Sequence, residues 1–135
     1  MNRAPVGIFD SGIGGLTVTR AIYERLPHES TIYFGDTARV PYGPKSPDTV
    51  KRYSLEILHW LLGQDVKAVV VACNTSTAHA LRALQEASPV PVLGVIKDPQ
   101  IVECQREVRQ IGFPVFLRQL TVNLQRLHER LPSLL

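Results

Sequence analysis

The chain contains 135 residues, of which 44% are hydrophobic and 20% are charged, and its formal net charge is +3 at pH 7. A chain of this length can bury a sizeable core without disulfides or metals, and its composition is typical of a globular domain. No basic run is interleaved with aromatic residues, and no apolar stretch approaches the roughly 20 residues that cross a bilayer. We therefore expect a globular protein that binds neither nucleic acid nor a membrane.

The amino terminus and the cysteines indicate the cellular compartment. Residues 1–5 lead directly into a short apolar run, whereas a secretory signal peptide needs a longer apolar stretch and a small-residue cleavage site. Cys73 and Cys104 lie in unlike sequence contexts, and neither has a metal ligand at a useful spacing. We expect a cytoplasmic protein with free thiols and no bound metal.

Short apolar runs alternate with amphipathic segments along residues 1–96. They predict strands at residues 6–9, 31–34, 68–72 and 90–96, and helices at residues 15–26, 47–62 and 77–87. This alternation is typical of an α/β domain, in which an open parallel sheet is flanked by helices on right-handed crossovers. We expect residues 1–96 to form one such domain.

The helix expected at residues 47–62 carries the strongest local signals. Ser46 suits the N-cap, Pro47 the first helical position and Asp48 the first turn. Its predicted apolar face consists of Val50, Tyr53, Ile57, Trp60 and Leu61. In the helix expected at residues 15–26, the apolar positions are Leu16, Val18, Ala21, Ile22 and Leu26.

Residues 97–135 follow a different pattern and are predicted to form a divergent, irregular to helical tail. Lys97-Asp98-Pro99 interrupts the chain, and leucines then recur at spacings of three and four residues. These are Leu117, Leu120, Leu124, Leu127 and Leu131. A helix that packs on its own domain is the favoured interpretation, and self-association into a homodimer through the leucines is the alternative.

Reactive or polar residues follow three of the predicted strands. Asp10, Asp36 and Cys73 each lie one or two positions beyond the end of a strand. Open parallel sheets bind ligands at the carboxyl ends of their strands. The sequence therefore predicts a ligand site at this edge of the sheet.

The segment from Asp10 to Gly15 joins a strand to a helix and is rich in glycine. Glycines allow backbone amides to approach an anion, and a helix amino terminus favours negative charge. A dinucleotide fingerprint needs a further glycine where Thr17 stands, and no phosphate-loop lysine follows. This segment suits a small substrate that carries both an ammonium and a carboxylate. Asp10 could bind the ammonium, and the backbone amides of the glycines could bind the carboxylate. Packing of a tight turn is the alternative explanation for these glycines.

Cys73-Asn74-Thr75 places a thiol and hydrogen-bond donors at the expected start of a helix, where the helix dipole favours a thiolate. The alternative is an inert buried cysteine that continues the strand.

Tyr42 lies in the proline- and glycine-rich loop at residues 37–46, where an aromatic side chain either contacts a ligand or covers an apolar edge. None of the four histidines has the spacing of a metal ligand.

Four segments resemble the glutamate racemase family. They are Val6-Gly7-Ile8-Phe9-Asp10-Ser11-Gly12-Ile13-Gly14-Gly15, Tyr33-Phe34-Gly35-Asp36-Thr37, Pro41-Tyr42-Gly43 and Val71-Ala72-Cys73-Asn74-Thr75. They occur in the family's order within residues 5–96. The resemblance implies a two-domain α/β enzyme that interconverts L- and D-glutamate without pyridoxal phosphate, metal or any other cofactor, and supplies D-glutamate for peptidoglycan.

The resemblance also implies roles for particular residues. Cys73 is similar to the thiol that faces one side of the substrate α-carbon, and Asp10 to a residue that assists proton transfer. The substrate-contacting positions implied by the family are Asp10, Ser11, Tyr42, Gly43, Asn74 and Thr75. Inversion at an α-carbon needs a base on one face and an acid on the other, which fits a pair of thiols.

The chain departs from the family in its last part. Family members are longer, and their second half supplies the opposing cysteine in a Cys-Thr-His context, which Glu103-Cys104-Gln105 does not match. We therefore expect residues 97–135 to be unlike the family and this chain alone to be catalytically impaired, as in a truncated or frame-altered product. A non-catalytic α/β binding or assembly module and an aspartate-preferring racemase remain alternatives.

Overall fold

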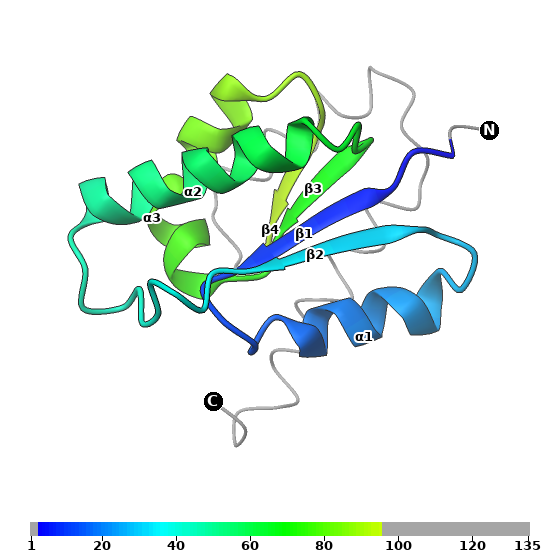
Figure 1. Cartoon of the computed structure of the whole chain (residues 1–135), viewed down its shortest axis with the longest axis horizontal. Helices are drawn as coiled ribbons and strands as arrows, with labels where there is room; N and C mark the ends of the chain where they lie inside the picture. The colour runs from blue at the N-terminus through cyan, green and yellow to red at the C-terminus, as the bar shows by residue number, and fades with distance from the viewer. Residues whose placement is uncertain (1–2, 96–135) are drawn as a thin grey trace.

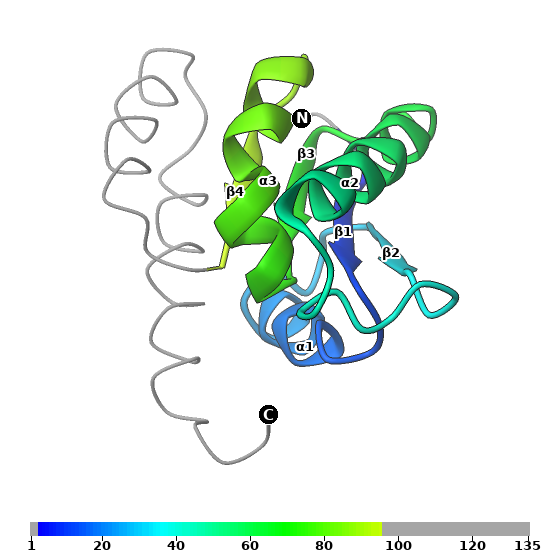
Figure 2. The same cartoon turned by 90° about the vertical axis from the view of Figure 1, so that its left-hand side faces the viewer.

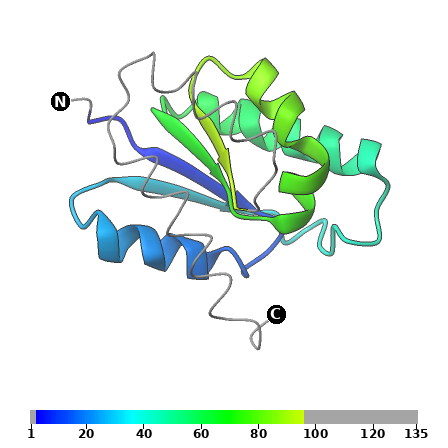
Figure 3. The same cartoon turned by 180° about the vertical axis from the view of Figure 1, so that it is seen from behind.

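The computed structural model describes residues 3–95, which form a four-stranded parallel sheet. The strands are β1 (Val6–Asp10), β2 (Thr31–Gly35), β3 (Ala68–Val71) and β4 (Val92–Gly94), in the spatial order β2-β1-β3-β4 (Figure 1). Helix α1 (Leu16–Arg25) covers one face of the sheet, and α2 (Pro47–Leu62) and α3 (Asn74–Ala87) cover the other (Figures 1 and 3). The predicted open parallel α/β fold is confirmed.

Each face of the sheet has its own hydrophobic core because successive strand residues point to opposite sides. Phe9 and Val71 pack under α2 and α3, whereas Ile8 and Val70 pack against Ile22 of α1. Helices on both faces explain why the strands are almost uninterrupted apolar runs. Figure 2 shows the two helical layers on either side of the sheet.

Helix α2 begins and ends as predicted, but the residues of its buried face differ. Ser46 is the N-cap, and its side chain accepts a hydrogen bond from the backbone N–H of Thr49. Trp60 is 44% exposed and lies beside Phe34 instead of entering the core. The core positions of α2 are Val50, Ser54, Ile57, Leu58 and Leu61. The prediction for Trp60 was wrong because α2 packs closely against α3, so the buried side of α2 is turned toward that helix. Similarly, Leu16 of α1 is exposed.

Helix α3 and strand β4 differ from their predicted bounds by more than one residue. Helix α3 begins at Asn74 rather than near Thr77, because Cys73 caps it with an extended backbone and a sulfur that accepts the Ser76 N–H. Strand β4 is shorter than the predicted run at residues 90–96. The Ser88 hydroxyl bonds both the N–H and the carbonyl of Val90, so these groups are satisfied locally instead of in the sheet.

The predictions for Cys104 and for residues 97–135 lie outside the described residues. Within residues 3–95, no helix is long and apolar enough to cross a membrane. The same residues contain no group of three or more histidine, cysteine or acidic side chains that could hold a metal ion.

Candidate active site at the carboxyl edge of the sheet

The structure brings the three predicted strand-end residues to one edge of the sheet. Asp10 is the last residue of β1, Asp36 follows β2, and Cys73 lies just beyond β3. The backbone N–H of Asp36 donates to the Asp10 carbonyl at 3.0 Å, which joins the ends of β1 and β2. All three side chains are buried, and Cys73 is only 4% exposed. The predicted convergence of these residues is therefore present in the fold.

Asp10 organises the turn that leads into α1. Its Oδ2 accepts hydrogen bonds from the backbone N–H groups of Gly12 at 3.2 Å and Gly15 at 3.0 Å. A Cβ added at Gly15 would lie 2.7 Å from the Asp10 Cβ and 2.9 Å from the Ala72 Cβ. Packing of a tight turn thus explains Gly15. The N–H groups of Gly12 and Gly15 bind the Asp10 carboxylate rather than a ligand. Within residues 3–95, no donor is bonded to the Asp10 Oδ1 atom.

Tyr33 is a component of this edge that the sequence patterns did not indicate. Its hydroxyl reaches from β2 across the turn and donates to the Gly12 carbonyl at 3.0 Å. Burial, together with the nearby acidic groups of Asp10 and Cys73, raises the pKa of Tyr33 to about 12. The phenol therefore remains a protonated donor at neutral pH. Its position inside an apolar run concealed this role.

We expect the Tyr33→Phe substitution to destabilise the protein by about 1 kcal/mol, because it deletes one hydrogen bond and leaves the Gly12 carbonyl unpaired. Urea unfolding at pH 8, followed by circular dichroism, measures this loss. The Tyr23→Phe variant is the matched control, since the Tyr23 hydroxyl bonds Thr31 at an exposed position. Equal stability of wild type and Tyr33→Phe at pH 8 would contradict the assigned bond.

The same pair of proteins has an expected pH dependence. The pKa of Tyr33 is raised from 10.0 to about 12 in the folded state, so the folded protein holds this proton more tightly than the unfolded chain. The resulting stabilisation is complete below pH 10 and is lost as the pH rises through 12. The stability advantage of wild type over Tyr33→Phe should therefore shrink when the unfolding curves are repeated at increasing alkaline pH.

Cys73 is the N-cap of α3, and the backbone N–H of Ser76 donates to its sulfur at 3.4 Å. A hydroxyl–hydroxyl bond of 3.1 Å from Ser54 on α2 to Ser76 holds the first turn of α3 in place. The Cys73 side chain belongs to a small buried cluster with Tyr42 and Val50. Cys73 is therefore buried, as the inert-cysteine alternative predicts. However, it lies beside Tyr42 at the carboxyl edge of the sheet and not among aliphatic side chains alone.

Tyr42 is 1% exposed and reaches into this edge from the loop between β2 and α2. Its hydroxyl donates to Asp36 Oδ2, and Arg39 Nε donates to the same oxygen at 2.7 Å. Burial, the hydrogen bond to Asp36 and the charge of Asp36 raise the pKa of Tyr42 well above its usual value. The phenol is therefore neutral and donates its hydrogen bond to Asp36. The alternative in which Tyr42 covers an apolar edge applies to its ring but not to its hydroxyl. A Cβ added at the neighbouring Gly43 would meet no atom within 4 Å, so open space adjoins the loop there.

The remaining predicted contact residues surround the same edge. Ser11, Asn74 and Thr75 are half-buried, and their side chains make no hydrogen bond within the part of the chain that the structure describes. They therefore offer polar groups that a ligand could use. Arg39, like Tyr33, was not singled out from the sequence, since a lone arginine in a loop carries no pattern.

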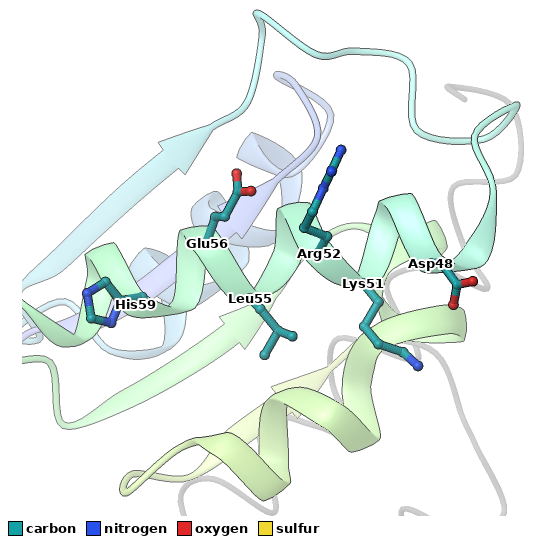
Figure 4. Close-up of a pocket in the computed structure, with 6 residues that line it drawn as sticks. All are labelled: Asp48, Lys51, Arg52, Leu55, Glu56 and His59. Carbon is teal, nitrogen blue, oxygen red and sulfur yellow. The ribbon is translucent and has the colours of Figure 1, made fainter.

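A shallow depression elsewhere lies along the outer side of α2 (Figure 4). It is lined by Asp48, Lys51, Arg52, Leu55, Glu56 and His59. None of the predicted site residues borders it, and its lining mixes both signs of charge. The edge of the sheet remains the better candidate for the site.

The sequence matches the profile of the Asp/Glu/Hydantoin racemase family over residues 6–111. The chain belongs to this family. The matched range extends beyond residue 96, where the boundary of the α/β domain was predicted, and that boundary stays a prediction. The turn at Asp10 and the capped thiol at Cys73 both lie inside the matched range.

Relatives and solved structures point to one branch of the family. The chain is 64% identical to the glutamate racemase of Geobacter metallireducens over 92 residues, which cover 68% of this chain and 34% of that protein. It is 51% identical to the Synechocystis glutamate racemase over 110 residues, which cover 82% of this chain and 39% of that protein. The glutamate racemase of Thermus thermophilus, solved with beta-chloro-D-alanine, superposes with a TM-score of 0.68 at 56% identity, covering 70% of this chain and 37% of that one.

A further solved relative carries an amino acid. The Francisella tularensis glutamate racemase, in complex with D-glutamate, superposes with a TM-score of 0.68 at 46% identity, over 70% of this chain and 36% of that one. The present chain spans little more than a third of the length of these relatives.

Proposed function

We propose that this chain provides the amino-terminal part of a glutamate racemase, which interconverts L- and D-glutamate by proton transfer without a cofactor. The observation that carries the proposal is the position of Cys73. Its sulfur caps α3 beside Tyr42, at the edge where Asp10 and Asp36 also lie. The identity to named glutamate racemases and the likeness to a structure that holds D-glutamate support this assignment.

In this mechanism Cys73 exchanges a proton with the α-carbon of glutamate. A thiolate here would accept the Ser76 N–H and face the positive end of the α3 dipole, which are conditions that suit a general base. Asp10 can accept the substrate ammonium on Oδ1 while its Oδ2 keeps the hydrogen bonds to Gly12 and Gly15. From this position Asp10 can also assist proton transfer. Ser11, Asn74 and Thr75 can donate to the substrate carboxylates as negative charge develops.

Tyr42 and Gly43 have distinct parts in this proposal. Because Asp36 engages the Tyr42 hydroxyl, Tyr42 would contribute its ring as a wall and its backbone as a contact. Gly43 adjoins open space in which a ligand group fits. The acid on the opposite face of the substrate would come from a part of the longer relatives that this sequence does not match. Supply of D-glutamate to peptidoglycan in the cytoplasm would follow from this activity.

Proton NMR of glutamate in D2O tests the activity. We expect the purified chain to replace the α-proton of one glutamate enantiomer by deuterium, with little net change in optical rotation. The reason is that Cys73 is the one thiol within residues 3–95. Aspartate at the same concentration should exchange more slowly. Faster exchange of aspartate would assign the chain to an aspartate-preferring racemase, and absence of exchange on either amino acid would remove the proposed activity from this chain.

A further inference from the structure

We propose that Arg39 is a positioning residue, which acts through Asp36 and α2 to hold the Tyr42–Gly43 loop against Cys73. The proposal deepens the function proposed above and rests on it, because the loop is one wall of the suggested glutamate site. Arg39 itself would not contact the substrate. Its role would be to fix how far Tyr42 and Gly43 stand from the thiol.

The first observation is a carboxylate oxygen shared by two donors. Asp36 Oδ2 accepts from the Tyr42 hydroxyl and from Arg39 Nε, and the Asp36 side chain is 6% exposed. A buried carboxylate is costly unless it is paired and hydrogen-bonded. Arg39 supplies a compensating charge beside the Asp36 oxygen that accepts from Tyr42.

The second observation is that Arg39 also contacts α2. Its Nη1 donates to Glu56 Oε2, and its guanidinium lies 4.0 Å from the centre of the Tyr53 ring. Figure 4 shows Glu56 extending from α2 on the side opposite to Leu55. Although burial acts against it, hydrogen bonds to Glu56 and Asp36 raise the pKa of Arg39, so the group remains a cation. A planar guanidinium makes these bonds and the ring contact together, which an ammonium cannot do.

The third observation joins this network to the thiol. The rings of Tyr53 and Tyr42 lie 5.8 Å apart, and Tyr42 packs on Cys73 and Val50. Tyr42 is thus held by Asp36 at its hydroxyl and by Tyr53 at its ring, and Arg39 contacts both of these partners. Loss of Arg39 would free the loop to move away from Cys73, which would expose the sulfur and displace Gly43.

The first test measures the rate at which iodoacetamide alkylates Cys73, quantified by mass spectrometry of the peptide that contains it. This readout needs no glutamate. We expect Arg39→Ala to accelerate alkylation about tenfold, because charged hydrogen bonds that close the loop are lost. Glu56→Gln, which weakens one arm of the network, should give a smaller acceleration. Arg39→Lys should lie closer to Arg39→Ala than to wild type.

Arg82→Ala is the matched control, because Arg82 also pairs with a glutamate but lies on the exposed side of α3. It should leave alkylation unchanged. Urea unfolding identifies variants that remain folded, and Glu56→Gln serves if Arg39→Ala does not fold. Wild-type alkylation rates in every folded variant of Arg39 and Glu56 would overturn the proposal.

The second test follows α-proton exchange as glutamate is titrated. A displaced loop should raise KM about tenfold or more in Arg39→Ala, with a smaller change in kcat. If the wild-type chain exchanges no α-proton while Arg39→Ala still exposes Cys73, the function proposed above fails and the positioning role stands. If wild type exchanges and the Arg39 variants keep its KM and kcat, the positioning role fails and the function stands.

Discussion

Replacement of Cys73 by alanine is expected to reduce α-proton exchange on glutamate by at least about 100-fold, the usual contribution of a general base. The reason is that the Cys73 sulfur lies at the start of α3, where it accepts a hydrogen bond from the Ser76 N–H. Proton NMR in D2O, with both glutamate enantiomers, measures the loss. Cys73→Ser provides a closer variant, because a hydroxyl keeps the cap on α3 but is a far weaker acid than a thiol.

The matched control is Cys104→Ala, which removes the chain's other cysteine. It should exchange at the wild-type rate, since Cys104 is not among the residues that we propose for the site. The unfolding curve of Cys73→Ser should remain close to that of wild type, which separates chemistry from folding. Undiminished exchange by folded Cys73→Ala would remove this thiol from the mechanism.

Alanine at Gly35 is expected to destabilise the fold by about 2 kcal/mol, within the usual range for overpacking. The added Cβ would lie 2.5 Å from the backbone carbonyl oxygen of Gly12. That carbonyl belongs to the turn held by Asp10 and Tyr33, so it cannot yield without disturbing the site. For a domain of this size, such a loss should lower Tm by roughly 10 °C. Differential scanning calorimetry measures it.

Alanine at Gly43 is the matched comparison, because its Cβ would meet no atom within 4 Å. We expect its Tm to equal that of wild type, whereas its KM for glutamate in the exchange assay should rise, since the methyl group would occupy space proposed for the ligand. A wild-type Tm for Gly35→Ala would show that the Gly12 turn is more compliant than its hydrogen bonds indicate. A wild-type KM for Gly43→Ala would place the ligand elsewhere.

The local sequence accounts for most of the secondary structure. Ser46 and Pro47 defined the start of α2 because capping and proline geometry act within one turn. The apolar runs of β1 and β3 indicated buried parallel strands, since both faces of such strands are covered. Parallel topology then brought Asp10, Asp36 and Cys73 to one edge, because the carboxyl ends of parallel strands meet there.

Packing between elements decided what these local patterns could not. The exposure of Trp60 and the burial of Ser54 depend on how α2 turns toward α3. Tyr33 bonds Gly12, and Arg39 and Tyr42 both bond Asp36. These partners follow from distances in the fold, and no periodicity in the sequence indicates them. The sequence by itself thus determined the fold class and the edge that carries the thiol. Tertiary structure alone decided which polar groups hold that edge in place, because hydrogen-bond partners follow from three-dimensional proximity.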